Sequence, residues 1–89
     1  MVKFTYEIQD KLGLHARPAG ALVKTAGKLS SKVVLQCKGK EADCKKLIAL
    51  MRMGIKYEDV VTFIVEGDNE AEDSRVLKEF CQVSLISRL

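Results

Sequence analysis

The sequence predicts an α+β fold, an open-faced two-layer sandwich in which three helices cover one face of a four-stranded, mostly antiparallel sheet. Segments with a two-residue hydrophobic period alternate with segments of helical period, and their order is β-α-β-β-α-β-α. The two central strands are joined by a short connection, which favours antiparallel pairing. Because a chain of 89 residues can bury one core and little more, we expect a single domain over residues 1–89.

The first strand and the first helix are predicted by the spacing of apolar residues. Residues 2–8 alternate between apolar and polar, which is typical of a half-buried strand, and a loop over residues 10–13 follows. The helix is expected to begin at residue 15 or 16 and to end at 27 or 28. Pro18 then lies in its first turn, where a missing N–H is tolerated. The apolar stripe of this helix comprises Ala19, Leu22, Val23, Ala26 and Leu29.

A hairpin and a short helix are predicted in the middle of the chain. Residues 32–38 are rich in β-branched side chains, and a turn at residues 38–40 leads into a short strand over residues 41–43. A helix is expected over residues 46–53, with Gly54 as its C-terminal stop. The residues that repeat at helical spacing there are Leu47, Leu50 and Met51.

The last strand and the last helix complete the predicted fold. Residues 59–66 form a strongly apolar strand that ends at Gly67. Asn69 and Glu72, three residues apart, predict a capping box at the start of the final helix. The side chains expected on the inner face of that helix are Val76, Leu77, Phe80 and Cys81.

The charge of the chain is unevenly distributed along the sequence. The 15 basic and 12 acidic side chains give a formal net charge of +3. Residues 1–56 carry 12 basic and 4 acidic groups, whereas residues 57–89 carry 3 and 8. A positive surface on the first part would attract phosphate groups, an acidic protein or nucleic acid. Because there is no tryptophan and aromatic residues make up only 6% of the chain, single-stranded nucleic acid is the less favoured of these.

Neither a membrane segment nor a metal site is indicated. The longest apolar run, residues 60–65, is far shorter than the roughly 20 residues of a membrane helix, and the N-terminus lacks the apolar block of a signal peptide, so we expect a cytoplasmic protein. The cysteines Cys37, Cys44 and Cys81 are odd in number and irregularly spaced, which predicts reduced thiols without a disulfide framework or a zinc site. Cys44, close to the short helix, is a candidate for exposure.

The stretch that could carry chemistry is residues 13–20, a loop that runs into a helix start. It holds the only histidine, His15, and Arg17 two residues later. Free backbone N–H groups and the positive end of the helix dipole make such a junction an anion site. The dipole favours a neutral imidazole, which can attack phosphorus, and the guanidinium of Arg17 can hold phosphoryl oxygens. By position alone, however, a lone histidine at a helix start is more often a capping or surface residue.

The motif Gly-Leu-His-Ala-Arg-Pro-Ala at residues 13–19 resembles the phosphorylation site of HPr, the histidine phosphocarrier family of the bacterial phosphoenolpyruvate-dependent phosphotransferase system (PTS). The resemblance extends to the chain length, the order of elements and the short apolar helix, and ends near Cys81. It implies that His15 accepts a phosphoryl group on Nδ1 from phosphorylated enzyme I and passes it to a sugar-specific enzyme IIA. It also implies that Arg17 and the backbone N–H groups of Ala16 and Arg17 stabilise that group, and that no cofactor is needed.

The resemblance further implies a docking surface for partner proteins on the first helix and the short second helix. Such a surface would be a small apolar patch around His15, ringed by Lys24, Lys45, Lys46 and Arg52, which suits an acidic partner and a fast, weak encounter. Core packing is the competing interpretation for Leu47 and Met51, whereas Ile48, off the main stripe, is the best candidate for exposure. The docking residues that the resemblance implies are Gly20, Lys24, Gly27, Leu47, Ile48 and Met51.

Two positions depart from the family pattern. Many members carry a regulatory serine at the start of the short helix, but this chain has Lys46, which can neither accept that phosphate nor mimic its charge. Leu12 stands where the family often has a small polar residue that assists the phosphoryl site, so the oxyanion contacts would depend more on the backbone and Arg17.

Three alternatives to a sugar-branch carrier stay open at this point. The first is a paralogue in a regulatory branch, such as the nitrogen-linked phosphotransferase system or a dihydroxyacetone kinase relay. The second is a regulatory binding module that keeps the fold, against which the intact His15 and Arg17 argue. The third is a small nucleic-acid-binding domain, whose affinity for DNA or RNA would depend steeply on salt concentration.

No paired carboxylates, Ser-His-Asp set or Walker loop support an enzyme that acts alone. The tail, residues 83–89, could pack on the domain or make a dimer contact.

Overall fold

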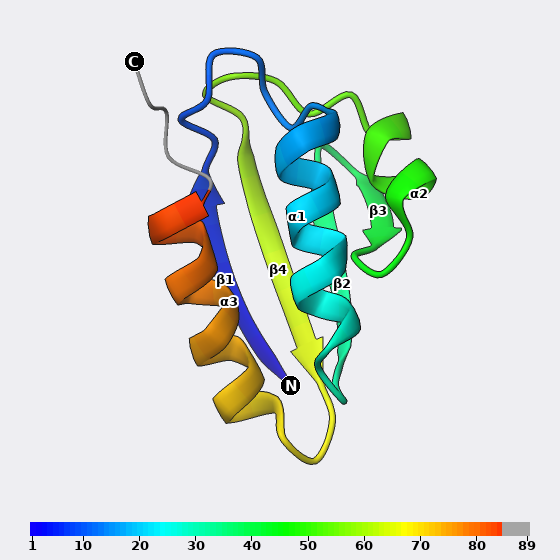
Figure 1. The fold of residues 1–89 in the computed structure, drawn as a ribbon, viewed down its shortest axis with the longest axis vertical. Coiled ribbons are helices and arrows are strands. Elements are labelled where there is room, and N and C mark those ends of the chain that lie inside the picture. The colour runs from blue at the N-terminus through cyan, green and yellow to red at the C-terminus, as the bar shows by residue number, and fades with distance from the viewer. Residues whose placement is uncertain (85–89) are drawn as a thin grey trace.

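A computed structural model describes residues 1–84 of the chain, and the remainder of the tail lies outside the described residues. The elements follow the predicted order and form two layers (Figure 1). The helix predicted from residue 15 or 16 to 27 or 28 has the expected ends. The strands are β1 Val2–Glu7, β2 Lys32–Cys37, β3 Lys40–Asp43 and β4 Val60–Glu66, and the helices are α1 Ala16–Gly27, α2 Leu47–Arg52 and α3 Glu70–Ser84.

The four strands form one sheet in the order β1-β4-β2-β3, and each of these pairings is antiparallel. Figure 1 shows α1 and α3 side by side over one face of the sheet, with α2 beside α1 near β3. The α+β class, the open-faced architecture and the order of elements are therefore confirmed. Within the described residues, no helix is long and apolar enough to cross a membrane.

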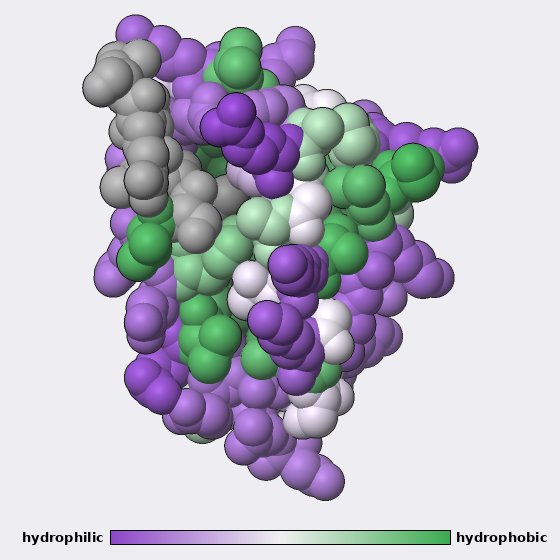
Figure 2. Space-filling model, viewed as in Figure 1, coloured by the Kyte–Doolittle hydropathy of each residue, from purple (hydrophilic) through white to green (hydrophobic). Residues whose placement is uncertain are grey.

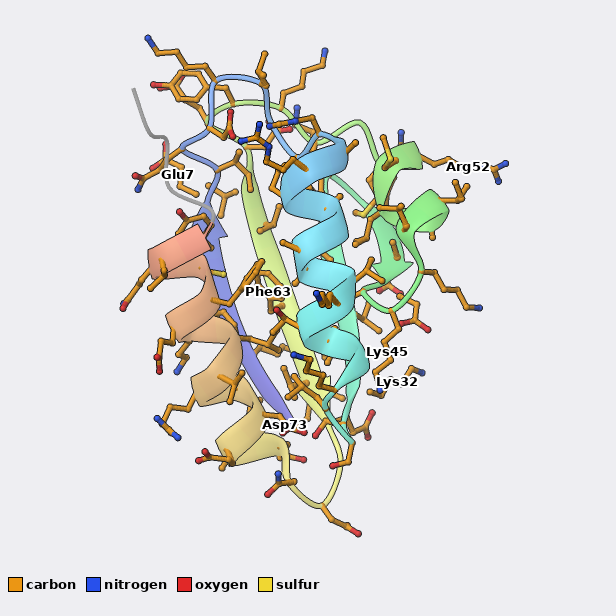
Figure 3. All side chains as sticks on the ribbon, in the orientation of Figure 1. Glu7, Lys32, Lys45, Arg52, Phe63 and Asp73 are labelled. Carbon is orange, nitrogen blue, oxygen red and sulfur yellow. The ribbon has the colours of Figure 1, made fainter. Side chains whose placement is uncertain are left out.

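The core lies between the sheet and the helices because alternate strand residues point to the helical layer. Phe63 of β4 sits at its centre, fully buried, and its ring stacks on that of its cross-strand partner Phe4, with centroids 4.9 Å apart (Figure 3). Leu22 of α1 and Leu77 of α3 close the core from the other layer. Within residues 1–84, the opposite face of the sheet is not covered by helices (Figure 1). Thr62, which lies between the buried residues Val61 and Phe63 of β4, belongs to that face.

The hairpin between β2 and β3 is tighter than predicted. Its two loop residues, Lys38 and Gly39, both have positive φ, at 52° and 79°. This pair of angles matches the twist of antiparallel strands, so Lys40 already belongs to β3 and pairs with Cys37.

The start of α3 differs from the predicted capping box of Asn69 and Glu72. The reciprocal pair is instead Gly67 and Glu70: the Glu70 carboxylate accepts the N–H of Gly67 at 3.3 Å, and the Gly67 carbonyl accepts the N–H of Glu70 at 3.2 Å. Glu72 faces solvent and binds Arg75, one turn further along the helix. The chain thus turns into the helix directly after β4.

All three cysteines are free and buried in this structure, which contradicts the exposure considered for Cys44. Cys44 continues the alternation of β3, so its side chain points inward like that of Ala42. Its N–H donates to the Val33 carbonyl at 2.9 Å. Burial raises the pKa of the Cys44 thiol to about 12, so the reactive thiolate is strongly disfavoured.

A buried carboxylate links α3 to the connection between α1 and β2. Asp73, on the side of α3 that faces the sheet, accepts the backbone N–H of Ser31 at 3.0 Å and the side-chain amide of Asn69 at 3.2 Å (Figure 3). The hydrophobic pattern did not predict this contact, because a polar residue on an inner face breaks the pattern that defines the face.

Replacement of Asp73 by alanine should lower the free energy of unfolding by about 1–3 kcal/mol, because the Ser31 N–H is left buried without its acceptor. Urea denaturation measures the change. Glu79→Ala, at an exposed position of the same helix, is the matched control and should change stability by less than about 0.5 kcal/mol. Equal losses in both variants would contradict a structural role for the Asp73 contact.

Candidate functional site

His15 lies where the loop after β1 becomes α1, as predicted from the motif. It is the N-cap residue of α1, with an extended backbone (φ −84°, ψ −174°), and its carbonyl accepts the Ala19 N–H at 3.0 Å. Its side chain makes no capping hydrogen bond. The half-buried imidazole instead has its Nε2 atom 3.2 Å from Oδ2 of Asp10.

The loop before His15 is fixed by backbone contacts with residues beyond α2. Gly13 has φ +71°, and a Cβ there would lie only 2.3 Å from the carbonyl oxygen of Ile55. The same carbonyl accepts the N–H of Leu14 at 3.1 Å, and the Leu14 side chain is buried in the core. The identities of Gly13 and Leu14, the first two residues of the motif, thus have a structural explanation: their contacts fix the point at which the chain enters α1.

The first turn of α1 leaves donors available to an anion. Ala16 and Arg17 are its first two residues, and the N–H groups of a first turn have no acceptor inside the helix. Pro18, the third residue, has no N–H and is buried, so it adds rigidity and no further donor. The turn contains no acidic side chain to compete with an anion, and Arg17 is exposed beside it.

Asp10 is the residue of this site that the sequence analysis missed, since it treated residues 10–13 only as a loop. Its Oδ1 atom accepts the Leu12 N–H at 2.9 Å, and its carbonyl accepts the Gly13 N–H at 2.8 Å. The Leu12 N–H and, after it, the His15 ring lower the pKa of the Asp10 carboxyl, which is therefore ionised at neutral pH. An aspartate that begins a turn two residues before a glycine is the signal that could have identified it.

At Leu12, the first departure from the family pattern, the backbone and not the side chain takes part in the contacts of the site. Its side chain is exposed, while its N–H holds Asp10. The second departure, Lys46, is the N-cap residue of α2, with φ −123° and ψ 107°, and its side chain makes no capping bond.

An apolar patch covers the outer side of α2. Ile48, Met51 and Leu47 are 62%, 43% and 37% exposed, whereas Leu50 alone of this helix is fully buried. The predicted exposure of Ile48 is confirmed, and core packing is excluded for Leu47 and Met51. Figure 2 shows apolar side chains gathered over α2, with hydrophilic residues around them.

The α1 face beside this patch is exposed and basic. Lys24 and Gly27 are exposed and Gly20 is partly so. Arg52 points away from the body of the protein (Figure 3). Lys45 is the exception in the predicted basic ring, because it is half-buried and its Nζ donates to the Leu29 carbonyl at 2.9 Å.

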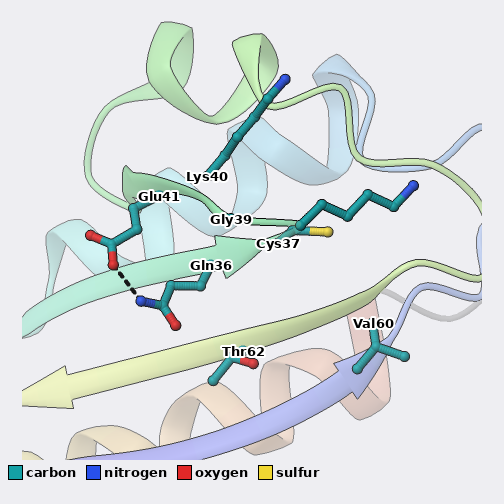
Figure 4. A pocket seen from close by; sticks show the side chains of 8 residues that line it. Gln36, Cys37, Gly39, Lys40, Glu41, Val60 and Thr62 are labelled. Atoms are coloured by element: carbon teal, nitrogen blue, oxygen red, sulfur yellow. Dashed lines mark hydrogen bonds between the residues drawn. The ribbon is translucent and has the colours of Figure 1, made fainter.

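A separate depression of about 250 Å³ lies beside the β2–β3 hairpin (Figure 4). Its lining includes Lys38, Lys40 and the hydrogen-bonded pair Gln36 and Glu41, and none of the predicted site residues. Among residues 1–84, no cluster of three or more potential metal ligands is present.

Comparison with known proteins places these features in a family context. Residues 2–82 match the family model described as the PTS HPr component phosphorylation site. The chain is 35% identical, over 79 residues and 89% of each protein, to the phosphocarrier protein HPr of Mycoplasma capricolum.

Two solved structures are similar over almost the whole chain. One is the histidine-containing phosphocarrier protein of a Mycoplasma, with a TM-score of 0.89 and 34% identity over 96% of this chain and 98% of that one. The other is HPr from Thermoanaerobacter tengcongensis, with a TM-score of 0.86 and 36% identity over 92% of each chain.

Proposed function

Because the chain belongs to the HPr family of phosphocarrier proteins of the phosphotransferase system, we propose that His15 is the residue that carries the phosphoryl group. In this proposal His15 accepts the group from phosphorylated enzyme I and passes it to the IIA domain of a sugar-specific permease. The observation that carries the proposal is the position of His15 at the N-terminus of α1, whose first-turn N–H groups have no acceptor inside the helix and whose first turn has no acidic side chain.

The transfer needs a nucleophile and a place for negative charge. A lone pair of the neutral imidazole forms the new N–P bond while the bond from phosphorus to the donor breaks, and that electron pair stays with the donor. The N–H groups of Ala16 and Arg17 and the Arg17 guanidinium then bind the phosphoryl oxygens. Transfer to IIA reverses these changes, so the protein ends each cycle unaltered and acts as a carrier.

The exposed side of α1 and α2 is the proposed docking surface. A Cβ at Gly20 or Gly27 would meet nothing within 4 Å, so packing inside the protein does not require glycine at either position. In the middle of a helix, as at Gly20, glycine nevertheless lowers stability by roughly 0.5–1 kcal/mol relative to alanine, and a partner that approaches the α1 backbone would explain its presence there. The apolar contacts would come from Leu47, Ile48 and Met51.

The cations at this surface favour an acidic partner. Lys24, Lys46 and Arg52 are exposed beside the apolar patch, and their charge would accelerate encounter with a negative surface. Lys46 occupies the regulatory-serine position, so phosphorylation by an HPr kinase at that position is not available to this chain.

We assign the carrier to the sugar branch, acting in the cytoplasm as a single domain over residues 1–89 with enzyme I and enzyme IIA as partners. A paralogue of the nitrogen-linked system or a dihydroxyacetone kinase relay would use the same His15 chemistry with another acceptor. A regulatory module without phosphotransfer would need neither His15 nor Arg17, and the chain has both.

Incubation with phosphoenolpyruvate, magnesium and enzyme I should add one phosphoryl group, which is acid-labile and alkali-stable, as intact mass measures. His15→Ala should add none, because the chain has no second histidine. Lys11→Ala, an exposed change in the same loop, is the control and should behave like the wild type. An unmodified wild type with both its own and a foreign enzyme I would refute the carrier function.

Ile48→Gln should reduce the second-order rate of phosphoryl transfer from enzyme I by about tenfold, because it removes an apolar contact from the centre of the proposed interface. Val60→Gln is the matched control, since Val60 is 57% exposed on β4, outside α1 and α2. Rapid-quench kinetics at low carrier concentration measures both. Equal rates of phosphoryl transfer in the two variants would show that enzyme I does not dock at Ile48.

A further inference from the structure

We propose that Asp10 is the positioning residue of the carrier: it holds the proton of His15 on Nε2 and so leaves Nδ1 as the atom that attacks phosphorus. This inference rests on the proposed function and adds to it a residue outside the motif. It starts from the 3.2 Å separation between Nε2 of His15 and Oδ2 of Asp10.

Both oxygens of this carboxylate have a defined partner. Oδ1 accepts the Leu12 N–H at 2.9 Å, and Oδ2 faces the imidazole. The Gly13 N–H closes the same turn onto the Asp10 carbonyl at 2.8 Å. The carboxylate is thus fixed in the loop that leads to His15, on the side of the ring away from Nδ1.

The chemistry of the two groups decides which ring nitrogen carries the proton. An ionised carboxylate can only accept hydrogen bonds, so the nitrogen that faces it must be the donor. A neutral imidazole has one N–H and one lone pair, and a proton on Nε2 leaves the lone pair on Nδ1. The lowered pKa of Asp10 keeps the carboxylate in its accepting form at neutral pH.

The same contact balances charge during transfer. Nδ1 of His15 forms the bond to phosphorus, the bond from phosphorus to the donor breaks with its electrons left on the donor, and Nε2 keeps its proton. The ring therefore gains a positive charge, which the Asp10 carboxylate stabilises from 3.2 Å. No proton has to enter or leave the ring, and the ring is neutral again after transfer to the acceptor.

The variant Asp10→Asn separates the effect of Asp10 on the His15 proton from its structural role in the turn. The new amide oxygen can still accept the Leu12 N–H, and its NH₂ group then faces Nε2 as a donor. The ring proton should consequently move toward Nδ1, which removes the nucleophilic lone pair. Asp68→Asn, at an exposed position in the loop between β4 and α3, makes the same chemical change away from the histidine and serves as the control.

Long-range ¹H–¹⁵N NMR of the neutral His15 ring gives the tautomer directly, without any phosphorylation step. We expect the Nε2–H form in the wild type and in Asp68→Asn, and a shift toward Nδ1–H in Asp10→Asn. The kcat of phosphoryl transfer should fall at least about tenfold in Asp10→Asn while KM for enzyme I changes less than about twofold, because the docking surface is untouched.

The inference is wrong if the wild type carries its proton on Nδ1, or if Asp10→Asn matches Asp68→Asn in both tautomer and kcat. Failure of the proposed function has a different signature, since the wild type would then accept no phosphoryl group. In that case the tautomer measurement alone decides whether Asp10 directs the proton of His15.

Discussion

The contact between the backbones of Gly13 and Ile55 is the constraint on which the rest of the site depends. It requires a residue with positive φ and no Cβ, because the Ile55 carbonyl lies where a side chain would begin. That carbonyl also accepts the Leu14 N–H, so the chain enters α1 at one point and in one direction. His15 becomes the N-cap residue as a consequence, directly before the first turn of α1, and its Nε2 atom lies 3.2 Å from the Asp10 carboxylate.

The two faces of α1 have different roles: the inner face packs on the sheet, and the outer face stays accessible to solvent. Its inner face is fully buried through Ala19, Leu22 and Ala26, and these mostly small side chains let the helix lie close to the sheet. Its outer face keeps Gly20 and Lys24 accessible beside the exposed side chains of α2. The same packing that fixes the N-terminus of α1 therefore also creates the surface that we propose for docking.

The fold and the motif could be predicted from the sequence because both depend on local patterns. Period-two and helical spacings located each element, and a string of seven residues located His15 and Arg17 at a helix start. Contacts between particular side chains were harder to predict from the sequence. The Asp10–His15 contact depends on how a tight turn orients a carboxylate, and the burial of Asp73 depends on a backbone N–H 42 residues away in sequence.

The packing of the short elements was likewise not determined by the hydrophobic pattern. The outward direction of Leu47 and Met51 follows from the way a six-residue helix packs through Leu50 alone, which hydrophobic spacing does not reveal. Cys44 was misjudged because its position one residue past the end of β3 still follows the strand alternation. A glycine three residues before Glu70, in place of the expected Asn69 and Glu72, begins the turn into α3.

The central claim is that a phosphoryl group on His15 is held by the first turn of α1. Backbone ¹H–¹⁵N spectra recorded before and after phosphorylation test it most directly. The account predicts the largest shifts at the amides of Ala16 and Arg17, to lower field because their N–H groups gain charged acceptors, with the β-sheet amides unchanged. Unchanged amides at these two residues, or dominant shifts at the β2–β3 hairpin, would contradict it.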